Sequence, residues 1–168
     1  MSGAVAAAKA IGEDVETLVV DAVAGLDAEA DEDAHHDAVV SDLLAPSLLS
    51  TTVPVTWAGI PLVEPDTKVE IKACKRWTSN GGHDIRGRWL CKGHDDGQHA
   101  ALLDAAAVYV LAVYEETPGG EKVLWRLVVI PASLLDEHLR GTWTGVDRRE
   151  GSVAKLSWGV LLPQGGER

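Results

Sequence analysis

The stretch Val69-Glu70-Ile71-Lys72-Ala73 decides how the rest of the sequence is interpreted. Its apolar residues alternate with Glu70 and Lys72, which is the period-two pattern of a β-strand. Successive strand side chains point to opposite faces, so we expect the apolar side chains to face the core and Glu70 and Lys72 to share the other face. A carboxylate beside an ammonium group suits a metal ion and a water held next to a phosphate. The alternative is an exposed ion pair on the strand surface, and Glu-x-Lys alone does not decide between them.

The charge of the chain is distributed unevenly around this strand. The formal net charge is -11, yet residues 68–92 carry seven bases and only two acids. Residues 1–67 carry 13 acids and one base, and residues 93–168 carry eleven acids and seven bases. The Glu-x-Lys pair therefore lies in the basic segment of an acidic protein, where we expect a polyanionic partner to bind.

Length and composition limit the class of protein. The 168 residues, 46% of them apolar, predict one domain with a real core over 1–168, with 1–3 and 163–168 frayed. Apolar runs fall short of the roughly 20 residues of a membrane span, and the N-terminus lacks a signal-peptide pattern. Two cysteines do not make a disulfide framework. These features predict a reduced, cytoplasmic setting without a membrane partner, and the acid excess resembles proteins of salt-loving archaea and their viruses.

The apolar pattern predicts helices interleaved with strands. The expected helices cover residues 4–26, residues 98–107 and a segment that begins at Pro131-Ala132-Ser133, with Ser133 as its N-cap. The expected strands cover residues 37–40, 53–57, 69–73, 85–91, 108–114, 123–130 and 155–161. This order is typical of an α/β fold in which helices pack on a mixed sheet.

Two connections interrupt this order. Residues 27–36 are dense in acids and predict a mobile loop. Residues 41–68 contain four prolines, which limit strand pairing, and this segment could be an insertion with a hairpin at Ala58-Gly59. The turn Pro118-Gly119-Gly120 predicts a hairpin between the two apolar strands that flank it.

A metal site at Glu70 needs a second carboxylate close by. Asp66 precedes Glu70 by four residues, which places it roughly 13 Å away along one strand unless the chain turns between them. Asp37 begins a different expected strand, which could be the neighbour of the Glu70 strand. The expected distance to Glu70 therefore favours Asp37 over Asp66. Glu13 and Glu16 on the first helix are further candidates, although both could simply face water.

These residues together resemble the PD-(D/E)xK nuclease superfamily, which includes restriction endonucleases, archaeal Holliday-junction resolvases and RecB-type exonucleases. The resemblance covers about residues 8–115 and consists of Asp37 followed by Glu70-Ile71-Lys72, after a helix with Gly12-Glu13-x-x-Glu16 and before Gln98-His99 and Tyr109. It implies a restriction-endonuclease-like mixed sheet flanked by helices. The Glu-x-Lys strand with Arg86-Gly87-Arg88-Trp89 is similar to small haloarchaeal relatives, whereas the long segment 41–68 departs from the family pattern.

The resemblance implies a metal-dependent nuclease. Asp37, Glu70 and the Ile71 carbonyl would hold Mg²⁺, for which Mn²⁺ could substitute. Lys72 would position or deprotonate the attacking water, a role that a lowered lysine pKa would assist. Gln98 would support this water, and either Glu13 or Glu16 would serve as an outer carboxylate.

DNA is the expected partner. The phosphate-binding candidates are Lys75, Arg76, Arg86 and Arg88, and the rings of Trp77 and Trp89 are candidates for base stacking. The sequence leaves open whether duplex, junction or single-stranded nucleic acid is the substrate. Double-strand cutters often pair, so a homodimer is among the open states.

A rival interpretation involves no catalysis. Cys74, with Cys91-x₂-His94-x₄-His99, supplies ligand types that zinc prefers, although the spacing is not that of a standard finger. These residues would then form a zinc site in a nucleic-acid-binding module, or the cysteines would be ordinary core residues. A nuclease fold that has lost activity and only binds a partner is a third interpretation.

Overall fold

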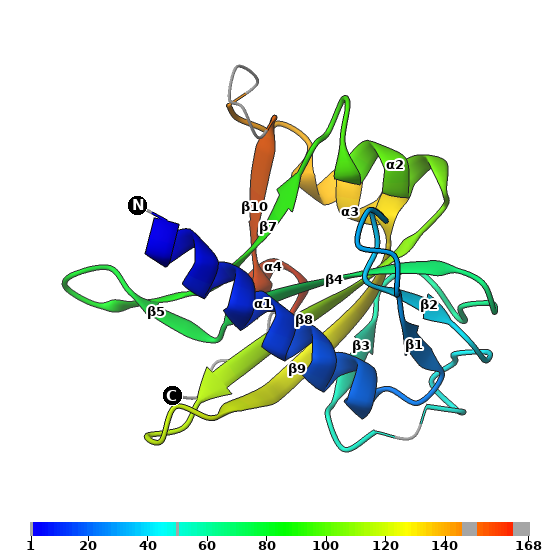
Figure 1. Ribbon diagram of the computed structural model, residues 1–168, viewed down its shortest axis with the longest axis horizontal. Helices are drawn as coiled ribbons and strands as arrows, with labels where there is room; N and C mark the ends of the chain where they lie inside the picture. Colours follow the sequence, from blue (N-terminus) through cyan, green and yellow to red (C-terminus); the bar gives the residue numbers. More distant parts are fainter. Residues whose placement is uncertain (1, 50, 146–150, 163–168) are drawn as a thin grey trace.

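The predicted α/β architecture, a mixed sheet flanked by helices, is confirmed. A computed structural model describes residues 2–49, 51–145 and 151–162 (Figure 1). The helices are α1 (Ser2–Ala22), α2 (Gln98–Asp104), α3 (Ala132–Leu139) and α4 (Trp158–Leu161). The strands are β1 (Leu26–Ala28), β2 (Ala38–Val40), β3 (Val55–Trp57), β4 (Lys68–Lys75), β5 (Trp77–Ser79), β6 (Asp84–Arg86), β7 (Arg88–Lys92), β8 (Val108–Glu116), β9 (Lys122–Pro131) and β10 (Val153–Ser157).

The main sheet has six strands in the order β1-β2-β4-β8-β9-β3. The Glu-x-Lys strand β4 lies inside it, antiparallel to β2 and parallel to β8. The predicted hairpin of β8 and β9 is confirmed. Two further two-stranded sheets pair β5 with β6 and β7 with β10. A parallel pair such as β4 and β8 needs a crossover, and α2 lies within the connection between these strands.

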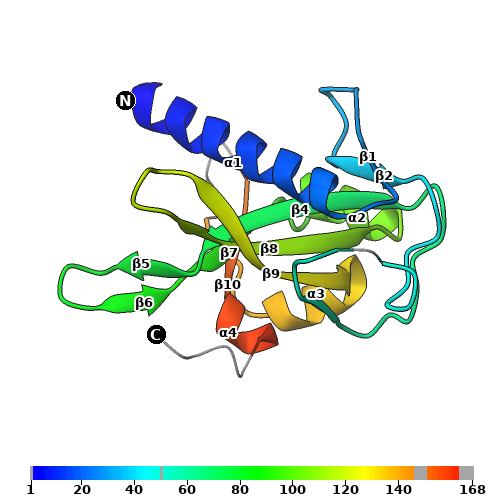
Figure 2. The ribbon, with the colours of Figure 1, turned by 90° about the horizontal axis from the view of Figure 1, so that it is seen from below.

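Different layers cover the two faces of the main sheet. Helix α1 lies across one face, and α2, α3 and α4 lie on the other (Figures 1 and 2). Val15 and Val19 of α1 are fully buried against the first face, in one cluster with Ile71. Trp89 and Leu135 belong to the second cluster. Both faces of β4 are therefore covered, since Ile71 belongs to the first cluster and Cys74 to the second.

The first helix ends earlier than the expected residue 26. Helix α1 stops at Ala22, and Gly25 then adopts a φ of 94°, a left-handed conformation that favours glycine. A side chain here would also lie 2.8 Å from Leu44 Cδ2. The reversal lets Leu26–Ala28 pair with β2, so the acidic segment 27–36 begins in a strand.

The expected strand 85–91 is divided into β6 and β7 at Gly87. A Cβ atom at this position would lie 1.8 Å from the carbonyl oxygen of Lys75, so only glycine allows the backbones to approach. Strand β6 then pairs with β5 in a hairpin that extends away from the main sheet (Figure 2), whereas β7 pairs with β10.

Four smaller expectations are wrong. Helix α3 begins after Pro131 with no side-chain cap, so Ser133 is not its N-cap. The expected strand 155–161 is strand β10 followed by helix α4, because the chain turns helical at Trp158. Ala58-Gly59 does not close a hairpin, since β3 instead runs parallel to β9 at the edge of the main sheet. Helix α2 is also shorter than predicted and ends at Asp104.

Candidate active site

Glu70 and Lys72 project from the same face of β4 and contact each other. The Lys72 ammonium donates to Glu70 Oε1, and the Glu70 side chain is almost completely buried. Lys72 keeps 22% of its side chain exposed, so the pair can be reached from solvent only on the lysine side. This burial excludes the alternative of an exposed surface ion pair.

Gln98, the first residue of α2, joins this pair. Its Nε2 donates to Glu70 Oε1 at 2.8 Å, and its Oε1 accepts from Lys72 Nζ at 3.1 Å. The same Nε2 lies 3.3 Å from the carbonyl oxygen of His35, in the loop that leads to Asp37. The structure thus places Gln98 beside the Glu-x-Lys pair and adds a link to the loop that the sequence did not reveal.

Asp37 lies immediately before β2, beside the part of β4 that follows its short pairing with β2. Its Oδ2 accepts from the Ile71 amide at 2.8 Å, and its own amide donates to the Val69 carbonyl at 2.9 Å. The N–H and C=O groups of one strand residue point to the same edge, so the Ile71 carbonyl also faces the Asp37 side. Asp66 is exposed in the turn before β4, and its amide bonds Val40 at the far end of β2. The structure therefore brings Asp37, rather than Asp66, to Glu70.

The helix acids border the same region from the α1 side. Glu13, Glu16 and Asp37 are among the residues that line a cavity of about 460 Å³ between α1 and the 28–37 segment. Glu16 is the helix acid that raises the pKa of Glu70. Among the two expected outer carboxylates, Glu16 is therefore electrostatically coupled to the pair.

Burial dominates the electrostatics of Glu70. Loss of water raises the pKa of this carboxyl to about 8, Lys72 opposes the rise, and Asp37 and Glu16 add to it. Burial by itself would lower the pKa of Lys72, but the attraction of Glu70 and Asp37 outweighs it, so the lysine pKa is raised. The lowered lysine pKa that would assist deprotonation of water is therefore not present in the protein without an ion, and Lys72 is a charged hydrogen-bond donor here.

The oxygen atoms around Glu70 are of the kind that a divalent cation binds. Glu70 Oε2 is buried and has no hydrogen-bond partner, although its fellow oxygen has two. A buried carboxylate oxygen left unpaired is costly, and a cation would satisfy it. Over the described residues, no group of three or more His, Cys, Asp or Glu is arranged to hold a metal. Mg²⁺ commonly takes one or two carboxylates and fills its shell with water and phosphate oxygens, so Asp37, Glu70 and the Ile71 carbonyl fit it.

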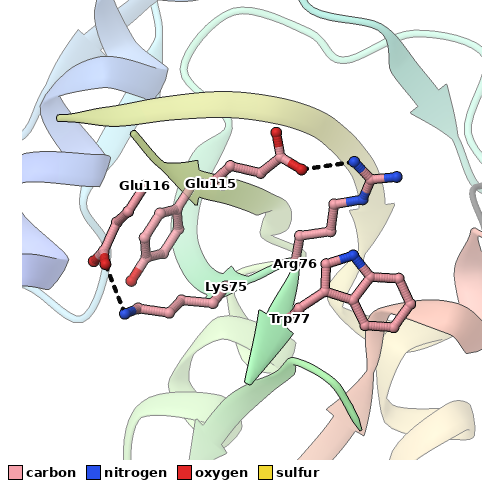
Figure 3. A pocket seen from close by; sticks show the side chains of 6 residues that line it. Lys75, Arg76, Trp77, Glu115 and Glu116 are labelled. Atoms are coloured by element: carbon pink, nitrogen blue, oxygen red, sulfur yellow. Dashed lines mark hydrogen bonds and ion pairs between the residues drawn. The ribbon is translucent and has the colours of Figure 1, made fainter. Parts of the chain in front are cut away.

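Half of the expected phosphate-binding residues are already paired. Lys75 Nζ lies 2.9 Å from Glu116, and Arg76 Nη1 lies 2.6 Å from Glu115 (Figure 3). The Arg76 guanidinium also lies over the Trp125 ring, 4.1 Å from its centroid. The two acids end β8, the parallel neighbour of β4.

Trp89 is not available for stacking, contrary to the prediction. It is 1% exposed, and its Nε1 donates to the Ala112 carbonyl at 2.8 Å. The ring lies in the core because Trp89 shares the inward face of β7 with Cys91. Trp77 is half-buried, edge-on to Trp158.

Arg86 and Arg88 are the expected basic residues that remain exposed. Both line a cavity of about 590 Å³ at the base of the β5–β6 hairpin. The Arg86 guanidinium lies 5.0 Å from the centroid of the Trp158 ring, which orients it. The surface for phosphate contacts is therefore narrower than the charge pattern predicts.

The described residues offer no ligand set for the zinc interpretation. Cys74 and Cys91 are buried free thiols, and burial raises the pKa of Cys91 to about 12 and that of Cys74 further. Both are neutral core residues in the protein without an ion, and within the described residues they form no group with His94 and His99 that could hold a metal. His94 and His99 instead contact Asp136.

A comparison with known families agrees with this geometry. The family model of the PD-(D/E)XK nuclease superfamily domain matches residues 1–162. The chain belongs to the PD-(D/E)XK nuclease superfamily. No curated protein and no solved structure matches it significantly. Nucleases of this superfamily generally use divalent metals, and membership indicates a nuclease domain with a nucleic-acid partner. Within the described residues, no helix is both long and apolar enough to cross a bilayer.

Proposed function

We propose that the protein is a Mg²⁺-dependent nuclease that hydrolyses phosphodiester bonds of DNA. The observation that carries the proposal is the unpaired, buried Glu70 Oε2 beside Asp37 and Lys72. The carboxylates of Asp37 and Glu70 would provide a cation site, and Lys72, two residues after Glu70, would provide a charged donor for a water or phosphate oxygen.

Each candidate residue would have its own role in hydrolysis. Asp37, Glu70 and the Ile71 carbonyl would hold the ion, which would lower the pKa of a bound water and neutralise charge on the scissile phosphate. Lys72, oriented by Gln98, would donate to the attacking water or to a phosphate oxygen. Glu16, with Glu13 on the same helix, would act as the outer carboxylate through water. Mn²⁺ would substitute because it prefers the same oxygen ligands.

Arg86 and Arg88 would hold the DNA backbone at the hairpin side. Both are exposed and border one cavity, and arginine binds phosphate oxygens in a bidentate manner. Lys75 and Arg76 would have to leave Glu116 and Glu115 before they could contribute.

The direct experiment incubates plasmid, single-stranded and four-way-junction DNA with Mg²⁺ or Mn²⁺. We expect cleavage by the wild-type chain and its loss in Lys72→Ala and Asp37→Ala, with circular dichroism unchanged. Lys68→Ala is the matched control, because Lys68 is an exposed lysine on the same strand. Equal cleavage by Lys72→Ala and wild type would overturn the proposed mechanism. DNA binding without cleavage of any substrate would leave a nuclease fold that only binds.

A further inference from the structure

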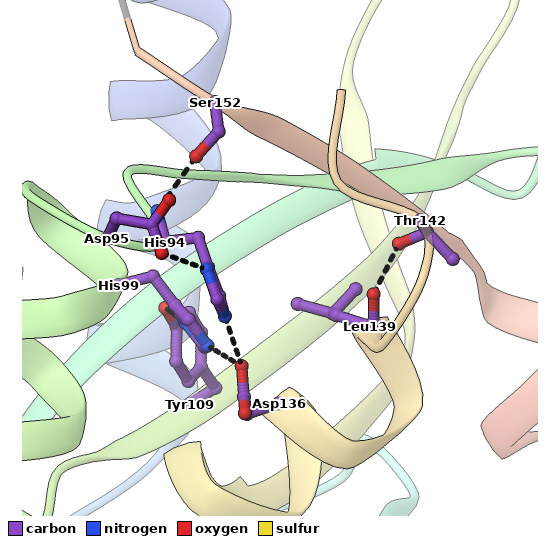
Figure 4. Close-up of polar contacts among 8 residues, drawn as sticks. All are labelled: His94, Asp95, His99, Tyr109, Asp136, Leu139, Thr142 and Ser152. Carbon is purple, nitrogen blue, oxygen red and sulfur yellow. Dashed lines mark hydrogen bonds and ion pairs between the residues drawn. The ribbon is translucent and has the colours of Figure 1, made fainter. Parts of the chain in front are cut away.

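A buried hydrogen-bonded chain lies directly behind Gln98. His99, the next residue of α2, is completely buried, and both of its ring nitrogens have partners. Nδ1 lies 2.8 Å from the Tyr109 hydroxyl, and Nε2 lies 3.1 Å from Asp136 Oδ1 on α3 (Figure 4). The chain therefore links β8, α2 and α3.

The chemistry of the partners selects one tautomer of His99. A carboxylate can only accept, so Nε2 carries the proton and donates to Asp136. Nδ1 then accepts from the Tyr109 hydroxyl, which stays protonated because burial raises the Tyr109 pKa. Burial also lowers the His99 pKa, although Asp136 opposes this, so the ring is neutral. Both ring nitrogens of His99 are satisfied in this single arrangement.

The hydrogen-bonded chain of Tyr109, His99 and Asp136 lies next to the candidate catalytic pair of Glu70 and Lys72. Tyr109 is the register partner of Glu70 in the parallel pairing of β4 and β8. At its outer end, Asp136 is also approached by His94 Nε2 at 3.6 Å, while His94 Nδ1 lies 2.8 Å from Asp95. The Trp143 ring packs on both histidines, 5.3 Å from His99 and 4.9 Å from His94 between centroids.

Helix α2 needs such an anchor. It has seven residues and no side-chain cap, and a helix of this length is not stable by itself. Gln98 must nevertheless keep its amide within hydrogen-bond distance of both Glu70 and Lys72. Because His99 follows Gln98 in the chain, a fixed His99 ring fixes the backbone from which the Gln98 side chain extends.

We propose that His99, Asp136 and Tyr109 are positioning residues, which act through α2 to place the Gln98 amide on Glu70 and Lys72. Their role in hydrolysis rests on the proposed function, whereas the placement of Gln98 does not. Misplacement of a supporting group by even 1 Å can cost roughly 100-fold in rate, which is why a short helix would need this anchor.

The placement is tested by NMR on the full chain without metal. Asp136→Asn removes the charge that fixes the His99 tautomer, and Glu137→Gln makes the same charge change at an exposed position of the same helix. We expect Asp136→Asn to lose the slowly exchanging His99 Nε2 proton and to shift the Gln98 side-chain amide signals, with Glu137→Gln unchanged. Tyr109→Phe, which keeps the ring, should shift the same Gln98 signals. Unshifted Gln98 signals in folded Asp136→Asn, or in Tyr109→Phe if the former does not fold, would overturn the inference.

Cleavage assays separate this inference from the proposed function. With an active wild type, Asp136→Asn should lower kcat roughly tenfold or more with KM unchanged, because the substrate contacts are elsewhere. An equal loss in Glu137→Gln, or an effect on KM alone, would contradict a positioning role. A wild type without activity would refute the proposed function, and the Gln98 signals would still decide the placement.

Discussion

Glu70 is a carboxylate that folding makes hard to ionise. Its pKa rises from 4.5 to about 8, chiefly because burial removes water. Between these values the folded protein holds one proton more than the unfolded chain, so the free energy of unfolding falls as pH increases. We predict that wild-type protein in EDTA loses stability between pH 5 and 8 more steeply than Glu70→Gln. Urea unfolding at several pH values measures both slopes, and identical slopes would show that Glu70 ionises normally.

The same proton must leave before Glu70 can bind a cation. Metal affinity should therefore rise with pH, by roughly tenfold per unit well below the Glu70 pKa, and level off above about 8. Calorimetric titration with Mn²⁺ from pH 6 to 9 measures this rise, and buffers of different ionisation enthalpy reveal the released proton.

Two aspartates serve as the matched pair for this titration. Asp37→Asn should weaken Mn²⁺ binding at every pH, because Asp37 lies at the Ile71 amide beside Glu70. Asp66→Asn should leave binding unchanged, because Asp66 is exposed near the far end of β2. The opposite ranking would assign the metal to Asp66.

Elements with long apolar runs could be predicted from the sequence, and short elements could not. Strands β8 and β9 are confirmed almost to their ends, because continuous apolar runs are typical of buried strands. The division of 85–91 depends on the Lys75 carbonyl, which local sequence does not place beside Gly87. The pairing of Lys75 and Arg76 with Glu116 and Glu115 follows from the parallel register of β4 and β8, which the residue pattern also does not contain.

The candidate site could likewise be predicted only in part from the sequence. Glu70, Lys72 and Asp37 could be selected because strand geometry limits their reach. The contact between His99 and Asp136 could not be predicted, because 37 residues separate the two and the sequence of α3 contains no motif that points to α2. The raised pKa of Lys72 also escaped prediction, because it depends on how deeply Glu70 is buried.

The junction between β6 and β7 gives a prediction at the scale of the element. Gly87→Ala would place a Cβ atom 1.8 Å from the Lys75 carbonyl oxygen, which forces β7 away from β4. We expect a loss of at least about 2 kcal/mol in the free energy of unfolding, as for other severe backbone clashes. Gly82→Ala is the control, because a Cβ there meets nothing within 4 Å. Chemical denaturation compares the two, and equal stability would show that the hairpin junction is loose.

The proposed function requires the whole molecule to bind a polyanion although its formal net charge is -11. At 1 M salt the Debye length falls to about 3 Å, so the long-range repulsion between the acidic surface and DNA disappears. Activity that persists or rises at molar salt would agree with the resemblance to haloarchaeal proteins. Fast cleavage at low salt with inhibition above moderate salt would contradict it.

The number of phosphate contacts decides how much salt weakens binding. Two arginines, Arg86 and Arg88, are exposed at the hairpin, and each duplex phosphate contact contributes about -0.9 to the slope of log affinity against log salt. We therefore predict a shallow slope of about -2, measured by fluorescence anisotropy in Ca²⁺ above 0.5 M salt, roughly the range where repulsion is screened. Arg88→Gln should reduce the slope by about one, whereas Lys122→Gln, whose ammonium is paired with Asp14, should not. A slope of about -3.6 would mean that Lys75 and Arg76 also leave their acids to contact phosphates, because four contacts at about -0.9 each give this value.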